Sequence, residues 1–154
     1  MVSSQEREEI EAVRQLKIQY CYLLDARNVP ELVKLFTDDA VCEFVGVFGN
    51  PEDGRWEGKA RITRGYQEKC ADAGDPWTSI HSVTNETIRV DGDTAWGRYY
   101  LLDYSMIDKA EDPLALLGLY DEDYRKVDGA WKICRSRIDV LYQLSALRRR
   151  EAAK

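Results

Sequence analysis

Helical periodicity dominates the first third of the chain. Ser3 followed by Glu6 has the form of a capping box, which predicts a helix over residues 4–26. A short second helix is expected after Asn28, and a third over 59–70. The apolar residues that define the first helix recur at spacings of three and four: Ile10, Val13, Leu16, Tyr20, Leu23 and Leu24.

The second half of the chain changes to a β-strand pattern. Asp-Gly pairs at 91–92 and 128–129 separate runs rich in β-branched and aromatic residues, which is typical of tight hairpins. Helices first and strands last favour the α+β class. We therefore expect a cone-shaped, curved mixed or antiparallel sheet, a half-barrel, packed on three N-terminal helices around a small-molecule cavity. The expected strands lie near 41–48, 80–90, 94–107, 115–127 and 130–142.

Composition bounds the class of protein. With 154 residues, of which 44% are hydrophobic, the chain predicts one domain over 1–154, ending in a basic tail at 144–154. It has no apolar run long enough to span a membrane and no signal peptide at its start, so we expect a cytoplasmic protein with no membrane partner. The net charge of −6 disfavours nucleic acid.

The sequence contains no motif for binding a cofactor or a metal ion. The four cysteines are irregularly spaced, only one histidine accompanies them, and no glycine-rich phosphate-binding motif is present. We therefore expect no cofactor, no metal, and a small-molecule substrate. The outer face of a curled sheet is usually covered by another copy, which predicts a homo-oligomer, either a trimer or a dimer.

Candidate chemistry starts at the only histidine. Strand alternation places His81, Val83 and Asn85 on one face. A lone histidine is more often a satisfied or surface imidazole than a functional one. Asp25 ends the first helix, where the macrodipole disfavours a carboxylate. It lies roughly 140° from Tyr20 on an ideal helical wheel, so the wheel alone predicts exposure.

Two further charged residues stand in apolar patterns. Asp103 shares a strand face with Tyr99 and Leu101, so it is either an inward carboxylate that needs a partner or a residue at the rim. Arg135 is expected to share a face with Trp131 and Ile133, which fits an anion site, a buried ion pair or a ladder of surface charges on an edge strand. Pocket walls and hydroxyl donors are expected from four tyrosines: Tyr20, Tyr22, Tyr99 and Tyr104.

The pattern as a whole resembles the SnoaL-like branch of the nuclear transport factor 2-like superfamily, over nearly the whole chain. It is most similar to the group of cofactor-free lyases containing scytalone dehydratase, the hexachlorocyclohexane dehydrochlorinase and bile acid 7α-dehydratase. The segments that carry the resemblance are 16–25 (LKIQYCYLLD), 35–40 (LFTDDA), 81–85 (HSVTN), 90–95 (VDGDTA) and 124–133 (YRKVDGAWKI).

The resemblance implies a site. His81 and Asp25 match the histidine and aspartate that form a dyad in this group, and Tyr20 and Asp103 match two further positions of the bile acid dehydratase. Arg135 lies where the dehydrochlorinase has an arginine. The same comparison implies that Phe44 stands in place of a second pocket tyrosine, which argues against a steroid substrate.

The expected function is a dehydratase-type lyase acting on a small cyclic, steroid-like or aromatic-derived compound. His81 would be the general base and Asp25 would fix its tautomer, while Tyr20 and Asp103 act on the leaving group or carbonyl and Arg135 balances negative charge. The alternatives are an isomerase or aldol-type lyase with the same dyad, and a non-catalytic binding or assembly domain. An epoxide hydrolase, prompted by Arg137 and Asp139, is a third option.

Overall fold

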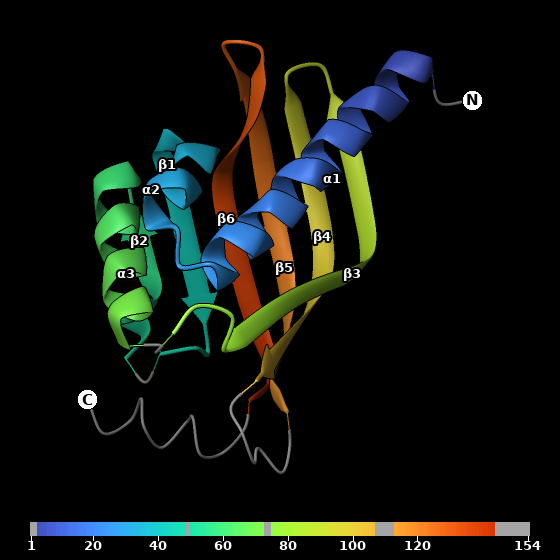
Figure 1. The fold of residues 1–154 in the computed structure, drawn as a ribbon. Coiled ribbons are helices and arrows are strands. Elements are labelled where there is room, and N and C mark those ends of the chain that lie inside the picture. Colours follow the sequence, from blue (N-terminus) through green and yellow to red (C-terminus); the bar gives the residue numbers. More distant parts are fainter. Residues whose placement is uncertain (1–2, 49, 73–74, 107–112, 144–154) are drawn as a thin grey trace.

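Three helices cover one face of a curved six-stranded sheet in the computed structural model (Figure 1). The structure describes residues 3–48, 50–72, 75–106 and 113–143. Its helices are α1 (Ser4–Asp25), α2 (Val29–Leu32) and α3 (Lys59–Asp72). Its strands are β1 (Phe36–Val45), β2 (Arg55–Glu57), β3 (Ser79–Asp91), β4 (Thr94–Ser105), β5 (Leu114–Val127) and β6 (Ala130–Gln143).

The sheet is mixed, in the order β2-β1-β6-β5-β4-β3. The β1–β6 pair is parallel and the other pairs are antiparallel. Helix α1 crosses the concave face diagonally, and its C-terminal end lies near the start of the long edge strand β3 (Figure 1). This is the α+β architecture that the sequence predicts.

Local signals place the helix starts and the hairpins. The Ser3 side chain accepts a hydrogen bond from the Glu6 amide at 3.0 Å, as the capping box predicts. Asn28 caps α2 through the Glu31 amide. At the β5–β6 hairpin Asp128 and Gly129 both take positive φ angles, 50° and 79°, which a two-residue type I′ turn requires.

The structure corrects the predicted strands near the first half of the sheet. β1 begins at Phe36, five residues before the predicted start, because α2 ends early and a 3₁₀ turn at Val33–Leu35 leads directly into the strand. The short strand β2 was not predicted at all. Its three residues are too few to show alternation, although Trp56 at its centre is buried.

Side chains fill much of the space between the helices and the sheet. The hydroxyl groups of Tyr20 and Tyr66 are hydrogen-bonded at 2.9 Å, and both rings are buried beside Phe36. Further along α1, Lys17 reaches Glu122 on β5, and both side chains are fully buried. The centre of the cone is therefore a packed core, and an open cavity has to lie toward its edge.

No helix among residues 3–48, 50–72, 75–106 and 113–143 is long and apolar enough to cross a membrane. The basic tail predicted at 144–154 lies outside the described residues.

Candidate active site

The C-terminal end of α1 meets β3 through one carboxylate and one imidazole. Nδ1 of His81 lies 2.6 Å from Oδ1 of Asp25. The backbone N–H of His81 also donates to both carboxylate oxygens, at 3.2 and 3.1 Å. Asp25 thus holds the ring and the main chain of the same residue, which fixes the imidazole orientation. The side chain of Asp25 is 4% exposed and that of His81 13%.

The end of α1 is shaped by its C-cap. Arg27 adopts a left-handed conformation with φ of 57°, and its amide donates to the Leu24 carbonyl at 3.0 Å. The Asn28 amide donates to the Leu23 carbonyl at 2.9 Å. This pair of bonds is a Schellman motif, and it makes Asp25 the last residue of the helix.

The helical wheel predicted that Asp25 would be exposed, and this prediction is wrong. Asp25 is 3% exposed because the segment that leads into β3 covers that flank of α1. The Trp77 amide donates to the Asp25 carbonyl at 2.9 Å, and His81 covers the carboxylate. The wheel describes the helix alone, so it cannot show a strand arriving beside the apolar stripe.

A cavity of about 300 Å³ adjoins the dyad. From α1 it is lined by Ile18, Cys21, Tyr22 and Asp25, and from the β3 side by Trp77, Ile80, His81, Ser82 and Val83. The second ring nitrogen of His81, Nε2, has no hydrogen-bond partner within the described ranges. A basic nitrogen that is held in place and left unbonded beside a cavity is able to take a proton from a bound molecule.

Asp103 lies close to the dyad on the same face of the sheet. It is the direct cross-strand partner of His81, and the Ser79 hydroxyl donates to its Oδ1 at 2.5 Å. Its face is the concave one, because Tyr99 and Leu101 on that face are buried. Asp103 is half-buried near the end of its strand, with Ser79 as its partner, so it lies on the concave face but at the rim, and it is not among the residues that line the cavity.

Three predicted site residues lie elsewhere. Tyr20 and Tyr99 are sealed in the core, where Tyr99 accepts a hydrogen bond from Tyr124 at 3.1 Å. Burial raises the pKa of Tyr20 well above its ordinary value, so it remains a neutral phenol. Phe44 packs on Trp56, with ring centroids 4.4 Å apart, and does not line the cavity beside His81. Of the predicted pocket tyrosines, Tyr22 lines that cavity and is 62% exposed.

Arg135 faces away from the dyad. Pairing shifts register on β6, because Tyr124 pairs with Ile133 whereas Asp123 pairs with Arg135. This bulge turns Arg135 to the convex face, so the prediction that it shares a face with Trp131 and Ile133 is wrong.

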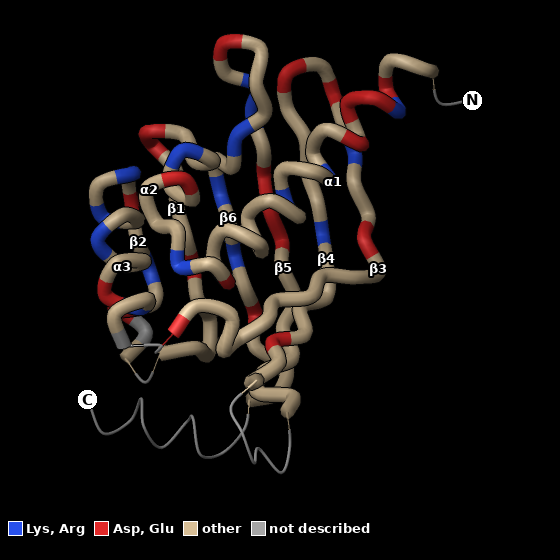
Figure 2. Tube along the Cα trace, in the orientation of Figure 1, with Lys and Arg blue, Asp and Glu red and all other residues tan. Residues whose placement is uncertain are grey.

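On the convex face Arg135 belongs to a row of alternating charges across five strands. Its guanidinium lies 3.2 Å from Glu43 and 3.1 Å from Asp121. The row continues on both sides, because Arg55 pairs with Glu43 at 2.7 Å and Arg98 pairs with Asp121 at 2.8 Å. Figure 2 shows the alternation as blue positions on β6 and β4 flanking red positions on β5. The predicted ladder of surface charges is therefore present, but it crosses the interior strand β6 and not an edge strand.

Asn85 is also displaced by a bulge. Between Thr84 and Thr87 the β3–β4 register shifts by one residue, and Asn85 takes a left-handed φ of 51° there. Its side chain is exposed and accepts from the Thr84 hydroxyl at 3.1 Å. The predicted alternation with His81 and Val83 stops at this point.

Trp77 and Ser79 were not predicted as site residues. Both precede the alternating part of β3, so no periodicity marks them. The one available signal was proximity in sequence to His81. Their places depend on how the chain returns from α3 to the sheet, which is a tertiary feature.

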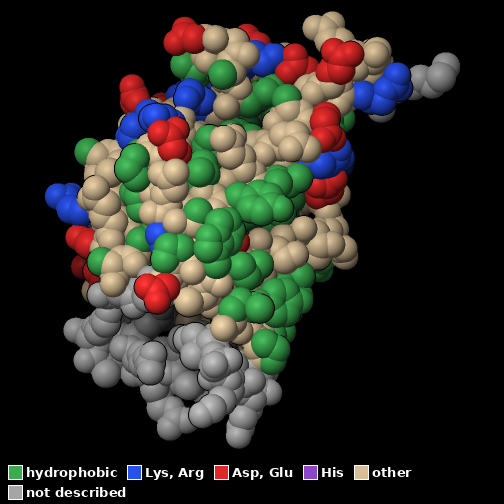
Figure 3. Space-filling model, viewed as in Figure 1, with side chains coloured by type: hydrophobic (Ala, Val, Ile, Leu, Met, Phe, Trp, Pro, Cys, Tyr) green, Lys and Arg blue, Asp and Glu red, His purple; other side chains and the backbone are tan. Residues whose placement is uncertain are grey.

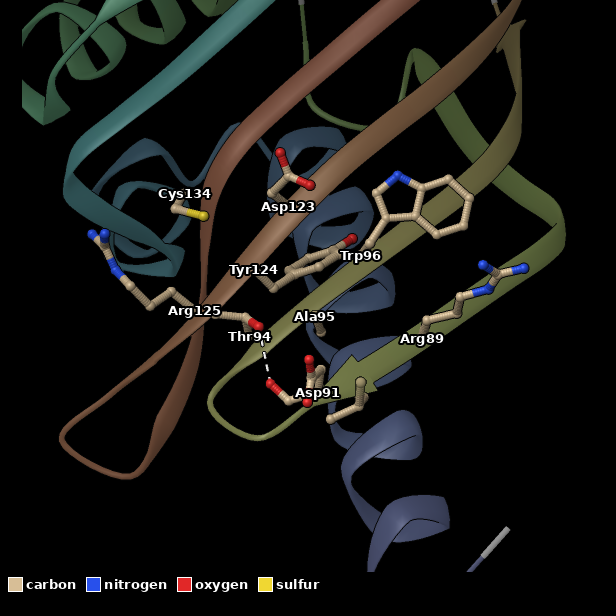
Figure 4. A pocket seen from close by; sticks show the side chains of 10 residues that line it. Arg89, Asp91, Thr94, Ala95, Trp96, Asp123, Tyr124, Arg125 and Cys134 are labelled. Carbon is tan, nitrogen blue, oxygen red and sulfur yellow. Dashed lines mark hydrogen bonds between the residues drawn. The ribbon is translucent and has the colours of Figure 1, made fainter. Parts of the chain in front are cut away.

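A larger hollow, of about 460 Å³, lies on the opposite face of the sheet. In Figure 4 α1 lies behind the strands, whereas Trp96, Asp123 and Cys134 stand in front. Arg125 at its edge pairs with Asp39 at 2.5 Å. Among the described residues that line this hollow there is no histidine, so the histidine–carboxylate pair is a feature of the smaller cavity. Within the part of the chain that the structure describes, no group of three or more His, Cys, Asp or Glu residues is placed to hold a metal ion.

Solved structures define the fold class. A Mycobacterium tuberculosis protein of unknown function superposes with a TM-score of 0.76 at 22% identity, covering 94% of this chain and 78% of that one. LinA gives 0.75 at 18% identity, covering 94% and 95%. A Novosphingobium aromaticivorans protein provisionally named a scytalone dehydratase gives 0.71 at 25% identity, covering 88% and 86%. The fold is nuclear transport factor 2-like, also called cystatin-like.

Sequence comparison identifies the family. The model of the SnoaL-like domain matches residues 5–137, so the chain belongs to the SnoaL-like family. An uncharacterised protein of Mycobacterium tuberculosis is 27% identical over 124 residues, covering 80% of this chain and 79% of its relative. The family and fold are thus shown, and neighbours named as dehydratases are similar at low identity.

Proposed function

We propose that this protein is a cofactor-independent lyase. It removes a proton from a carbon next to a carbonyl group and expels a leaving group, such as hydroxide, from the adjacent carbon. The observation that carries the proposal is the 2.6 Å contact between Asp25 and Nδ1 of His81 beside a cavity, while Nε2 has no hydrogen-bond partner among the described residues. This is the arrangement of an oriented general base.

Each residue of the dyad has one task. The Asp25 carboxylate accepts a hydrogen bond from Nδ1–H of His81, so the lone pair of the neutral imidazole is on Nε2. Nε2 takes the substrate proton, and the C–H electron pair forms the new C=C bond. The C–O bond breaks, and its pair leaves on oxygen. Asp25 then stabilises the imidazolium, which returns its proton to the departing hydroxide as water.

Asp103 is given no proton-transfer step, because the imidazolium supplies the proton and Asp103 is not among the described residues that line the cavity. Its cross-strand register with His81 brings it to the same face, and Ser79 orients it. Tyr20 is not given a direct role, because its hydroxyl is engaged with Tyr66 inside the core. Arg135 is likewise omitted, since it lies on the convex face among carboxylates. The Novosphingobium neighbour's provisional name, a dehydratase, supports this reaction class.

The test is elimination from cyclic β-hydroxy ketones, with 3-hydroxycyclohexanone as the first compound and enone absorbance as the readout. The matched pair is His81→Ala against Thr87→Ala, an exposed residue of the same strand. We expect turnover by the wild type and Thr87→Ala, and a loss of about 10²- to 10⁴-fold in His81→Ala. Deuterium exchange without elimination would indicate an isomerase. A wild type that binds these ketones but neither exchanges nor eliminates would contradict the enzyme and favour a binding domain.

A further inference from the structure

Trp77 is held in a backbone conformation that bulky side chains rarely adopt. Its φ is 65°, and the other non-glycine residues with positive φ in the described ranges are Arg27, Asn85 and Asp128. Asn and Asp tolerate this conformation, whereas Trp in it is a genuine outlier. The flanking chain fixes it, because its amide donates to the Asp25 carbonyl and the Thr78 carbonyl accepts from the Met106 amide at 2.8 Å.

Burial does not offset this strain. Trp77 is 50% exposed, and Tyr22, which lines the same cavity from α1, is 62% exposed. Figure 3 shows apolar side chains gathered along the lower half of α1 and beside β3. A strained residue that keeps half of its large ring in water contributes little to the core. Such residues collect at functional sites, where the strain places a side chain for a ligand.

The cavity beside Trp77 has little charge. Apart from Asp25 and His81, the side chains that line it are uncharged, among them Ile18, Ile80 and Val83. A carboxylate or phosphate on the ligand would meet the Asp25 carboxylate, and no lysine or arginine is among the described residues that line the cavity. The volume of about 300 Å³ is at the lower end of the range of small-molecule sites. The cavity therefore fits an uncharged compound of one or two rings.

We propose that Trp77 is the specificity-determining residue of this site. Its indole is an aromatic wall against which the flat face of an uncharged one- or two-ring ketone lies, with an acidic C–H directed at Nε2 of His81. The inference rests on the proposed function for the role of His81, but ring recognition by Trp77 is measurable without turnover. It also predicts exclusion of anions of the same shape.

The experiment compares the binding of 1-tetralone, an uncharged two-ring ketone, with that of the 1-naphthoate anion by calorimetry. Trp77→Gly removes the wall and relieves the left-handed strain. We expect it to weaken 1-tetralone binding about tenfold or more, with a melting temperature equal to or above that of the wild type. Trp77→Asn, which tolerates positive φ, should show the same loss. Asp128→Gly, the same kind of change at a distant hairpin, should leave Kd unchanged. Naphthoate should bind the wild type at least tenfold more weakly than 1-tetralone.

Several outcomes would overturn the inference. One is unchanged 1-tetralone affinity in both Trp77 variants, and another is equal affinity for naphthoate. If Trp77→Gly dissociates an oligomer and leaves the ketone affinity unchanged, the exposed surface around Trp77 and Tyr22 is a contact between copies of the chain instead. The two proposals fail separately. If 1-tetralone binding depends on Trp77 but the wild type exchanges no proton, the role of His81 as a base is contradicted. If the wild type exchanges protons and Trp77→Gly binds 1-tetralone with an unchanged Kd, only the role of Trp77 is contradicted.

Discussion

Two buried acid–base pairs connect α1 to the sheet: Lys17–Glu122 and Asp25–His81. They differ in whether the pair adjoins a cavity. Lys17 and Glu122 lie 2.9 Å apart with both side chains fully buried. Glu122 also accepts hydrogen bonds from Ser136 at 2.6 Å and from Tyr124 at 2.5 Å. The Lys17 ammonium group lies 3.3 Å from the centre of the Tyr120 ring, so it too is enclosed.

The Asp25–His81 pair is built differently. Within the described part of the chain, the hydrogen bonds to the Asp25 carboxylate come from His81, and this histidine keeps one ring nitrogen without a partner while lining a cavity. The comparison teaches that burial of a charged pair does not mark a site. A pair that is enclosed by core side chains stabilises the fold, whereas a pair that adjoins a cavity is a candidate for chemistry.

The largest expected effect is at the reactive pair. Asp25→Asn keeps the size of the side chain but loses the negative charge that orients and stabilises the imidazole. We expect ketone elimination to fall by about 10²- to 10⁴-fold, while the free energy of unfolding changes by about 1 kcal/mol. Steady-state kinetics and urea denaturation on the same samples check both parts. If Asp25→Asn is unfolded or fully active, the distinction between a reactive Asp25–His81 pair and a structural Lys17–Glu122 pair is contradicted.

The Lys17–Glu122 pair should show the reverse, a large effect on stability and little effect on activity. Lys17→Met leaves Glu122 buried without its cation, and breaking such a pair costs about 3–5 kcal/mol of stability. Urea denaturation measures this loss, and activity should fall only as the folded fraction falls. Lys34→Met is the matched control, since Lys34 pairs with Glu31 at the surface, where such pairs contribute less than about 1 kcal/mol. Equal costs for the two substitutions would contradict the distinction.

The sequence predicts the fold better than it predicts the site. Periodicity, caps and Asp-Gly turns mark most elements, because these signals are local. The faces of Asn85 and Arg135 were mispredicted, because one extra residue in a bulge turns every later side chain over and no local pattern marks it. The partners of Asp25 depend on which strand reaches the flank of α1, so only the resemblance to a family paired it with His81.

A smaller effect is expected two residues beyond Asp25. Arg27 occupies the left-handed position of the Schellman motif, where glycine is free of strain. We expect Arg27→Gly to raise the free energy of unfolding by about 0.5–1 kcal/mol, read from thermal or urea denaturation. Asp128→Gly should gain less, because aspartate tolerates this conformation. A large loss of stability in Arg27→Gly would mean that contacts of the arginine side chain, such as its bond to the Leu24 carbonyl, outweigh the backbone strain.

The smallest effect belongs to the charge row on the convex face, a third kind of ion pairing that is open to solvent. Burial raises the pKa of Asp121, but hydrogen bonds from Arg98 and Arg135 outweigh this and hold it below the ordinary value. A lowered carboxyl pKa stabilises the fold above about pH 4, and that stabilisation is lost as the pH falls through the lowered value. Arg135→Ala should therefore cost less than about 1 kcal/mol at pH 7, and the difference from wild type should shrink toward pH 2 and in molar salt. Urea denaturation across this pH range measures the difference. If Arg135→Ala lowers the free energy of unfolding by several kcal/mol and this loss persists in acid, Arg135 behaves like the buried Lys17–Glu122 pair. The contrast between buried and solvent-exposed pairs would then not hold for this sheet.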